Sequence, residues 1–329
     1  MRRRQVLMLL AAAAGARLGA APPAIAAQPS AQQVLTDMRL SADDRQKVLN
    51  GEFVTSEVPA VSDRDLSFAI AFLAKTSPES LGEQVMGGDL VTADAQVQSW
   101  GEVKGSLGDF ARLNLTGDEA KALAAAKPGD AFNLSAAEIG ALASARGGPD
   151  AVVQTLRKLL FARYQAYRSA GLAGIAPYDR GGGRTTDHAA DLRRASEASA
   201  GLKKYVPAFR AALLGYPKTT APQMRESFFW MKSIIEGKAT YILAHLMGAP
   251  DGSAFALARR QYYASTSYNG EQSTAGFLPV AGGTVAVVAS HAFTDQATGF
   301  GGSMKRGIGS TMMAKKMREI FEAGRKKAG

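Results

Sequence analysis

Cysteine is absent from this chain of 329 residues. Disulfide bonds, thiol catalysis, cysteine-ligated zinc or iron–sulfur centres and a lipid anchor on cysteine are therefore excluded. Histidine is scarce: His188, His245 and His291 are the only three, and no HxH or HExxH spacing occurs. We therefore expect neither a metal site nor a cofactor. No nucleophile-elbow motif is present either, so the sequence does not support a hydrolase.

An excess of positive charge is present, but it is confined to the two ends of the chain. The formal net charge is +10, and four arginines within residues 1–26 contribute +4 of it. Residues 301–329 hold eight lysines and arginines against Glu319 and Glu322, which leaves the body of the chain neutral. A basic surface interleaved with aromatic residues is missing, so no nucleic-acid partner is expected.

The first 26 residues have the three parts of an export signal. Arg2, Arg3 and Arg4 precede an apolar stretch over 5–21, and Ala24-Ile25-Ala26 offers small residues for cleavage. The apolar run is too short, and too interrupted by Arg17, to be a permanent membrane span. We therefore predict a cleaved signal peptide and a periplasmic protein, exported by the general secretory or the twin-arginine route.

Patterns of apolar residues predict both strands and helices in the remaining chain. Alternation indicates strands over 65–72, 97–104, 110–115, 227–235, 239–247, 258–268 and 284–294. Ser77 and Pro78 predict a short helix that ends at Gly87-Gly88. Capping boxes at Thr116 and Ser135 begin a helical region that extends to Gly215. A final helix is expected from Ser303 or Ser310 to Lys327, with an apolar stripe on Met304, Ile308, Met312, Met313, Met317, Ile320 and Phe321.

Short connections between the later strands predict their pairing. The joints at 236–238 and 250–253 are too short for a parallel crossover, so neighbouring strands should be antiparallel. Residues 269–283 contain Pro279 and Gly282-Gly283 and are expected to form a loop. The predicted fold is a single α+β domain over 27–329, in which an antiparallel sheet wraps a long C-terminal helix and carries a helical insertion over 116–215.

The order of these elements resembles the START-like (helix-grip) lipid-binding superfamily. The resemblance is carried by Ser67–Phe72 followed by Thr76-Ser-Pro-Glu79, and by Phe228-Phe-Trp230 through His291-Ala-Phe-Thr-Asp295 to the last helix. It covers about half of the predicted mature chain, and the insertion departs from it. What the resemblance implies is an apolar cavity between the curved sheet and the last helix, for a lipid-like or aromatic ligand.

Aromatic and polar residues on the predicted strands are candidates for binding that ligand. The set is Trp230, Lys232, Tyr241, His245, Tyr263, Tyr268 and His291. Aromatic side chains suit a hydrocarbon or flat ligand, and histidines could fix its polar group. The same residues are ordinary sheet formers and core histidines, so the pattern also fits plain packing. A second hypothesis is an enzyme that uses His245 or His291 with Asp295; His188 is expected to be exposed.

The glycine-rich start of the last helix is the most unusual local sequence. Gly301, Gly302, Lys305 and Arg306 could form an anion site at a helix N-terminus or a hinge at a cavity mouth. The Met-rich basic helix that follows could instead dock on an anionic membrane, which gives a third hypothesis, an envelope interaction protein.

Overall fold

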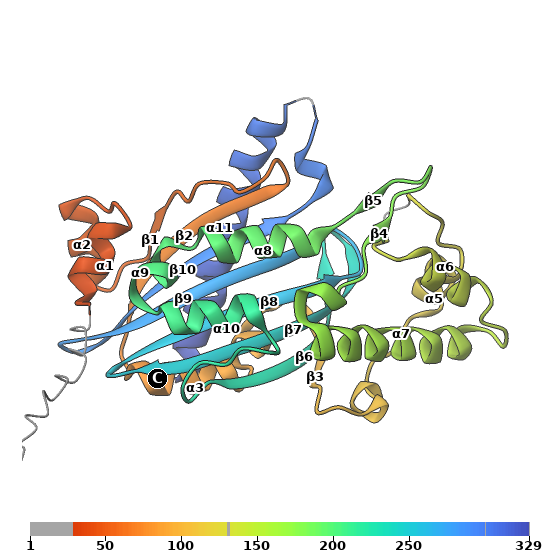
Figure 1. Cartoon of the computed structure of the whole chain (residues 1–329), viewed down its shortest axis with the longest axis horizontal. Coiled ribbons are helices and arrows are strands. Elements are labelled where there is room, and N and C mark those ends of the chain that lie inside the picture. Colours follow the sequence, from red (N-terminus) through yellow and green to blue (C-terminus); the bar gives the residue numbers. More distant parts are fainter. Residues whose placement is uncertain (1–28, 130–131, 300, 329) are drawn as a thin grey trace, which may run out of the picture.

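A computed structural model describes residues 29–129, 132–299 and 301–328 of the chain (Figure 1). The predicted signal peptide lies outside these residues. Among the described helices, none combines the length and apolar composition needed to cross a bilayer. The structure is α+β, as predicted, with an antiparallel sheet at its centre and helices on both faces of that sheet.

The sheet contains eight strands in the order β1-β2-β10-β9-β8-β7-β6-β3. Their bounds are β1 Val54–Ser56, β2 Asp65–Ala74, β3 Val97–Glu102, β6 Arg225–Ile235, β7 Lys238–Asp251, β8 Ala254–Ala264, β9 Gly270–Val280 and β10 Gly283–Phe293. Every neighbouring pair is antiparallel. The short joints after β6 and β7 are hairpins, as expected from their length.

Two predictions about strands are wrong. The expected loop at 269–283 contains strand β9, which pairs with β10 along its whole length and with β8 from Glu271 to Phe277. Two strand neighbours satisfy its backbone and override its unfavourable composition, and Pro279 is tolerated because it lies next to the strand end. The expected strand at 110–115 is absent: a 3-10 helix, η1 Leu107–Phe110, is formed there, with a capping box of Ser106 and Asp109.

One face of the sheet is covered by α3 Pro78–Met86, α4 Asp89–Ala93 and the long helix α11 Gly302–Ala328. Ser77 caps α3 with Pro78 in its first turn, as predicted. From about Gly309 onward α11 packs against the sheet: Gly309 lies against Leu66 of β2, and Phe321 meets Phe72 with ring centroids 4.6 Å apart. The first turns project beyond the sheet (Figure 1). The predicted apolar stripe is therefore split: Met317 and Phe321 are buried, whereas Met304, Ile308 and Met312 are 71%, 57% and 67% exposed.

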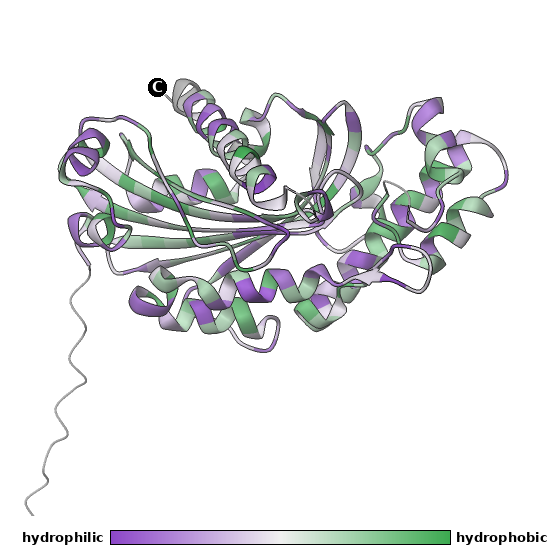
Figure 2. Cartoon of the chain, turned by 90° about the horizontal axis from the view of Figure 1, so that it is seen from above, coloured by the Kyte–Doolittle hydropathy of each residue, from purple (hydrophilic) through white to green (hydrophobic). Residues whose placement is uncertain are grey.

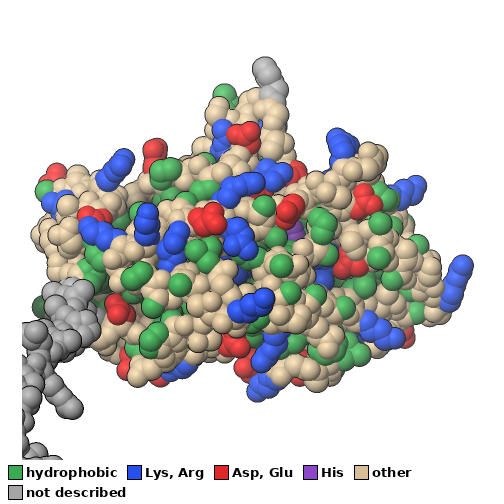
Figure 3. Space-filling model, in the orientation of Figure 1, with side chains coloured by type: hydrophobic (Ala, Val, Ile, Leu, Met, Phe, Trp, Pro, Cys, Tyr) green, Lys and Arg blue, Asp and Glu red, His purple; other side chains and the backbone are tan. Residues whose placement is uncertain are grey.

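The opposite face is covered by the helical insertion, which joins β3 to β6 (Figure 2). It comprises η1, α5 Gly117–Ala124, α6 Ala136–Ala143, α7 Pro149–Ala170, η2 Gly171–Gly174, the hairpin of β4 Tyr178–Asp179 and β5 Thr185–Thr186, then α8 His188–Ala198, α9 Ala200–Tyr205 and α10 Pro207–Gly215. Both predicted capping boxes are present, at Thr116 and Ser135. Helices α1 Ala31–Asp37 and α2 Ala42–Leu49 pack at the end of the sheet near β2. Lysines and arginines are interspersed with acidic residues on the insertion side (Figure 3).

Candidate functional site

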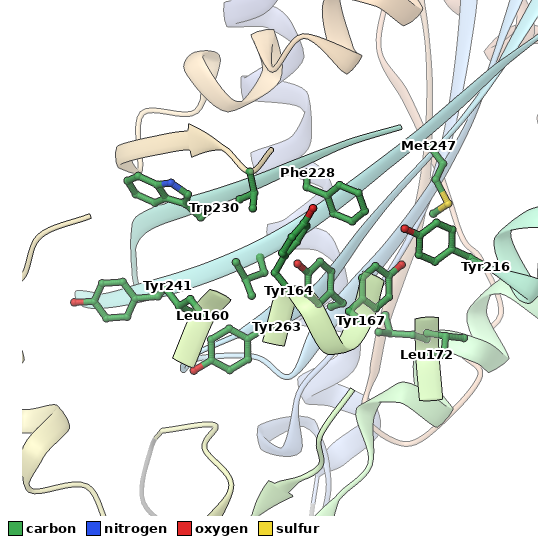
Figure 4. Packing of buried hydrophobic residues seen from close by; sticks show 14 of the residues in the cluster. Leu160, Tyr164, Tyr167, Leu172, Tyr216, Phe228, Trp230, Tyr241, Met247 and Tyr263 are labelled. Carbon is green, nitrogen blue, oxygen red and sulfur yellow. The ribbon is translucent and has the colours of Figure 1, made fainter. Parts of the chain in front are cut away.

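The predicted ligand residues do not surround a cavity between the sheet and α11. Trp230, Tyr241 and Tyr263 point to the opposite face and pack against α7 of the insertion (Figure 4). The Trp230 Nε1 donates to the Asp109 carbonyl at 2.8 Å, and the guanidinium of Arg163 lies 4.2 Å from the centre of the Tyr263 ring. These aromatic side chains form the core between sheet and insertion. Alternation shows which residues of one strand share a face, but it could not tell which layer covers that face.

Lys232 lies on the same side and is already paired. Its Nζ donates to Glu119 Oε2 at 2.7 Å, and the Tyr241 hydroxyl donates to the same oxygen at 3.2 Å. Glu119 is also the capping-box residue of α5. Lys232 and Tyr241 therefore tie the insertion to β6 and β7 and are not left free for an anionic ligand.

Both ring nitrogens of His245 are engaged in a buried chain of hydrogen bonds. The Tyr167 hydroxyl accepts from Arg260 Nη1 at 3.0 Å and lies 3.0 Å from His245 Nδ1. On the other side, His245 Nε2 is 3.1 Å from Glu226 Oε2. The network assigns the proton to Nε2, which donates to Glu226, and makes Nδ1 the acceptor. Burial lowers the pKa of His245 to about 4, so the ring is neutral at neutral pH.

The pairing of His245 or His291 with Asp295 is not formed. His291 Nδ1 instead lies 2.8 Å from Asp65 Oδ2, while Asp295 forms an ion pair with Arg180 at 2.9 Å. Strands β8 and β9 separate the two histidines. The constellation expected for an enzyme in a shared pocket is therefore absent from the described residues.

His188 is buried, contrary to the prediction that it is exposed. Its side chain is 0% exposed, stacks on Tyr178 with ring centroids 4.1 Å apart, and reaches the Tyr262 carbonyl from Nε2 at 3.0 Å. Burial lowers its pKa to about 3. The prediction was wrong because the surrounding glycines and charges belong to a hairpin that folds back onto β8 and β9.

The glycines before α11 shape a tight turn. A Cβ on Gly302 would lie 2.7 Å from the Ala297 carbonyl oxygen, and Gly301 has a φ of 73°. Arg306 donates to the Asp63 carbonyl at 3.1 Å, and Lys305 is exposed. The segment turns the chain sharply from η3 Asp295–Ala297 into α11, and the close backbone approach explains why glycine is needed there.

A different group of polar side chains is buried on the α11 side of the sheet. We call it the polar cluster; its members are Arg259 and Gln261 of β8, Tyr268 of the loop after β8, Glu271 and Ser273 of β9, and Ser290 of β10. Apolar residues of the same face surround it, among them Leu257, Ala275 and Val288. Of these six residues, only Tyr268 was among the predicted site residues. It was expected on a strand over 258–268 but lies in the loop after β8, which ends at Ala264.

Glu271 is the centre of the polar cluster. Its carboxylate accepts from Arg259 Nη2 at 2.7 Å and from Gln261 Nε2 at 2.8 Å. Two serine hydroxyls donate to the same carboxylate, Ser273 at 2.6 Å and Ser290 at 3.2 Å. The Tyr268 hydroxyl donates in turn to Gln261 Oε1, and burial raises the pKa of Tyr268 well above its usual range. Glu271 is only 5% exposed, whereas the Arg259 side chain keeps 19% exposure.

A hollow of about 250 Å³ opens on the same face, near the β3 edge of the sheet. Its lining is Met86, Gly87, Trp100, Gly101, Glu102, Arg112 and Phe229. Phe229 pairs with Ala244, and Ala244 pairs with Gln261 of the polar cluster. Phe229 and Gln261 are thus two strand spacings apart, which is about 10 Å. Only the small side chain of Ala244 lies between the hollow and the polar cluster along this row of paired residues.

No family model, curated protein or solved structure matches this chain. The candidate site is therefore argued from its own geometry. At the rim of the site, Lys316 of α11 forms an ion pair with Asp94 at 2.7 Å. Asp94 also lies close enough to Arg259 for their opposite charges to attract each other. The site thus combines a polar cluster, an adjacent hollow with aromatic lining, and one ion pair that joins α11 to the end of α4.

Proposed function

We propose that the protein binds or carries an amphipathic small molecule on the α11 side of its sheet. The apolar part of the ligand lies in the hollow against Trp100 and Phe229, and its polar group lies toward the polar cluster. The observation that carries the proposal is the ion pair of the buried Glu271 with the partly buried Arg259 within an apolar face. Buried charged groups cost desolvation energy that apolar side chains would avoid, and a few placed polar groups in an apolar site are typical of ligand binding.

The order of the elements supports the same proposal. β2 is followed by α3 and α4, then β3 and, after the insertion, β6 to β10 continue across the sheet, and α11 follows β10. This order agrees with the helix-grip resemblance, which implies a ligand between sheet and last helix. The insertion covers the other face and leaves this side to α3, α4 and α11. Export to the periplasm remains part of the proposal, on the evidence of residues 1–26 alone.

Calorimetric titration of the protein with decanol and decanoate tests this function. We expect saturable binding that weakens about tenfold in a Trp100→Ala variant, because the hollow loses its largest aromatic wall. A Leu107→Ala variant is the control, since Leu107 is 38% exposed on η1 and does not line the hollow. If the unmodified protein binds neither probe and carries no small molecule in native mass spectra, the proposal is refuted.

A second candidate function is docking on an anionic membrane through the start of α11. Met304, Ile308 and Met312 are spaced by four residues, so they lie on one side of the helix and are all more than half exposed. Lys305 and Lys315 are exposed close to them. An apolar stripe flanked by cations is the pattern of a helix that lies in the membrane interface.

A further inference from the structure

Among the charged groups of the polar cluster, the guanidinium of Arg259 has the most unused hydrogen-bonding capacity. The two oxygens of Glu271 already accept from four side chains. Arg259, by contrast, has five N–H groups to donate. Only its Nη2 donates to another described side chain, at 2.7 Å to Glu271.

The Arg259 side chain is also partly accessible. It is 19% exposed, whereas the Glu271 side chain beside it is 7% exposed. Glu271 holds the guanidinium through Nη2, and that carboxylate is itself held by Ser273 and Ser290. A planar guanidinium with one edge fixed presents its other edge to a planar acceptor group.

We infer that the ligand of this site carries a carboxylate, and that this carboxylate binds the open edge of Arg259. The inference rests on the proposed function and specifies its ligand class. An ammonium group carries only donors and a positive charge, so it cannot accept from Arg259 and is repelled by it. A hydroxyl can accept a hydrogen bond but brings no charge, and hydrogen bonds to charged partners are the stronger kind.

Three probes with one alkyl chain test the inference on the unmodified protein. Decanoate should bind roughly 10- to 100-fold more tightly than decanol, which corresponds to one charge-assisted hydrogen-bonded contact. Decylamine should show no saturable binding at the same concentrations. If decanol binds as tightly as decanoate, the carboxylate inference is overturned and the proposed function stands. If no alkyl probe binds and native mass spectra show no bound small molecule, both fail together.

Two variants test whether Arg259 causes the preference for decanoate over decanol. Arg259→Gln should abolish the difference between decanoate and decanol and leave the affinity for decanol within a few-fold of the original. Arg318→Gln removes the same charge from a side chain of α11 that is 52% exposed, and it should keep the preference intact. A preference retained in Arg259→Gln, or lost in Arg318→Gln, would show that general surface charge selects the anion. Should Arg259→Gln fail to fold, the comparison of the three probes on the unmodified protein still decides the inference.

Discussion

Lowering the pH from 7 to 5 should destabilise this protein through its two most deeply buried histidines. Burial lowers the pKa of His188 to about 3 and that of His245 to about 4, from an ordinary value of 6.5. The unfolded chain therefore binds protons as the pH falls below 6.5, while the folded protein does not. Stability is unaffected above that value and is lost progressively below it, until the folded pKa is reached.

The size of the loss follows from the same values. At pH 5 each ring is 1.5 pH units below its unfolded pKa of 6.5, and each unit costs about 1.4 kcal/mol, so each histidine costs about 2 kcal/mol and the pair about 4 kcal/mol. Glu226 does not add to this loss, because its pKa is lowered by the hydrogen bond to His245 and its contribution disappears only at more acidic pH.

Urea unfolding followed by tryptophan fluorescence at pH 7 and pH 5 measures the effect. His188→Gln and His245→Gln should each remove about half of the pH dependence, whatever they cost at pH 7, because glutamine does not titrate. The reasoning would be refuted if both single variants kept the full pH dependence of the unmodified protein, since other groups would then be the ones that bind the protons.

Two further predictions concern close packing and the exposed end of α11. A Cβ added by Gly82→Ala would lie 2.7 Å from the buried Phe255 ring and should lower the free energy of unfolding by about 1–3 kcal/mol. The control Gly140→Ala places its Cβ in open space on α6 and should be neutral or stabilising by up to about 1 kcal/mol. Equal effects of the two variants would contradict the packing argument. A Met304→Ser and Met312→Ser double variant should no longer sediment with anionic vesicles, with neutral vesicles as the control for charge; undiminished sedimentation would remove the docking hypothesis.

Local signals in the sequence predicted the elements well where local chemistry determines them. Ser77-Pro78 begins α3, the capping boxes at Thr116 and Ser135 begin α5 and α6, and alternation located β2, β6 and β7. These features depend on hydrogen bonds and burial within a few residues. They are therefore visible in a single sequence.

The candidate site could not be predicted in the same way. Pro279 and Gly282-Gly283 made the segment that contains Glu271 and Ser273 appear to be a loop, because proline and glycine are typical of one. The segment becomes strand β9 because it pairs with both β8 and β10, which overrides its local preference. The same pairing brings Glu271 and Ser273 next to Arg259. Likewise, Trp230 and Tyr263 were assigned to the face of α11 because nothing local indicates that the insertion covers the other face.

The pairing of β2 with β10 has a consequence for folding kinetics. Asp65 and His291 lie side by side in the sheet but are 226 positions apart in the chain. Contacts between such distant residues are slow to form, because the closure entropy of a long loop is lost before the contacts compensate for it. Until β10 joins, β2 has only the three-residue β1 beside it. β2, the first long strand to be synthesised, therefore remains without its main partner until β10, the last strand, has been synthesised. A shortened chain without β10 would expose the whole edge of β2 that β10 covers.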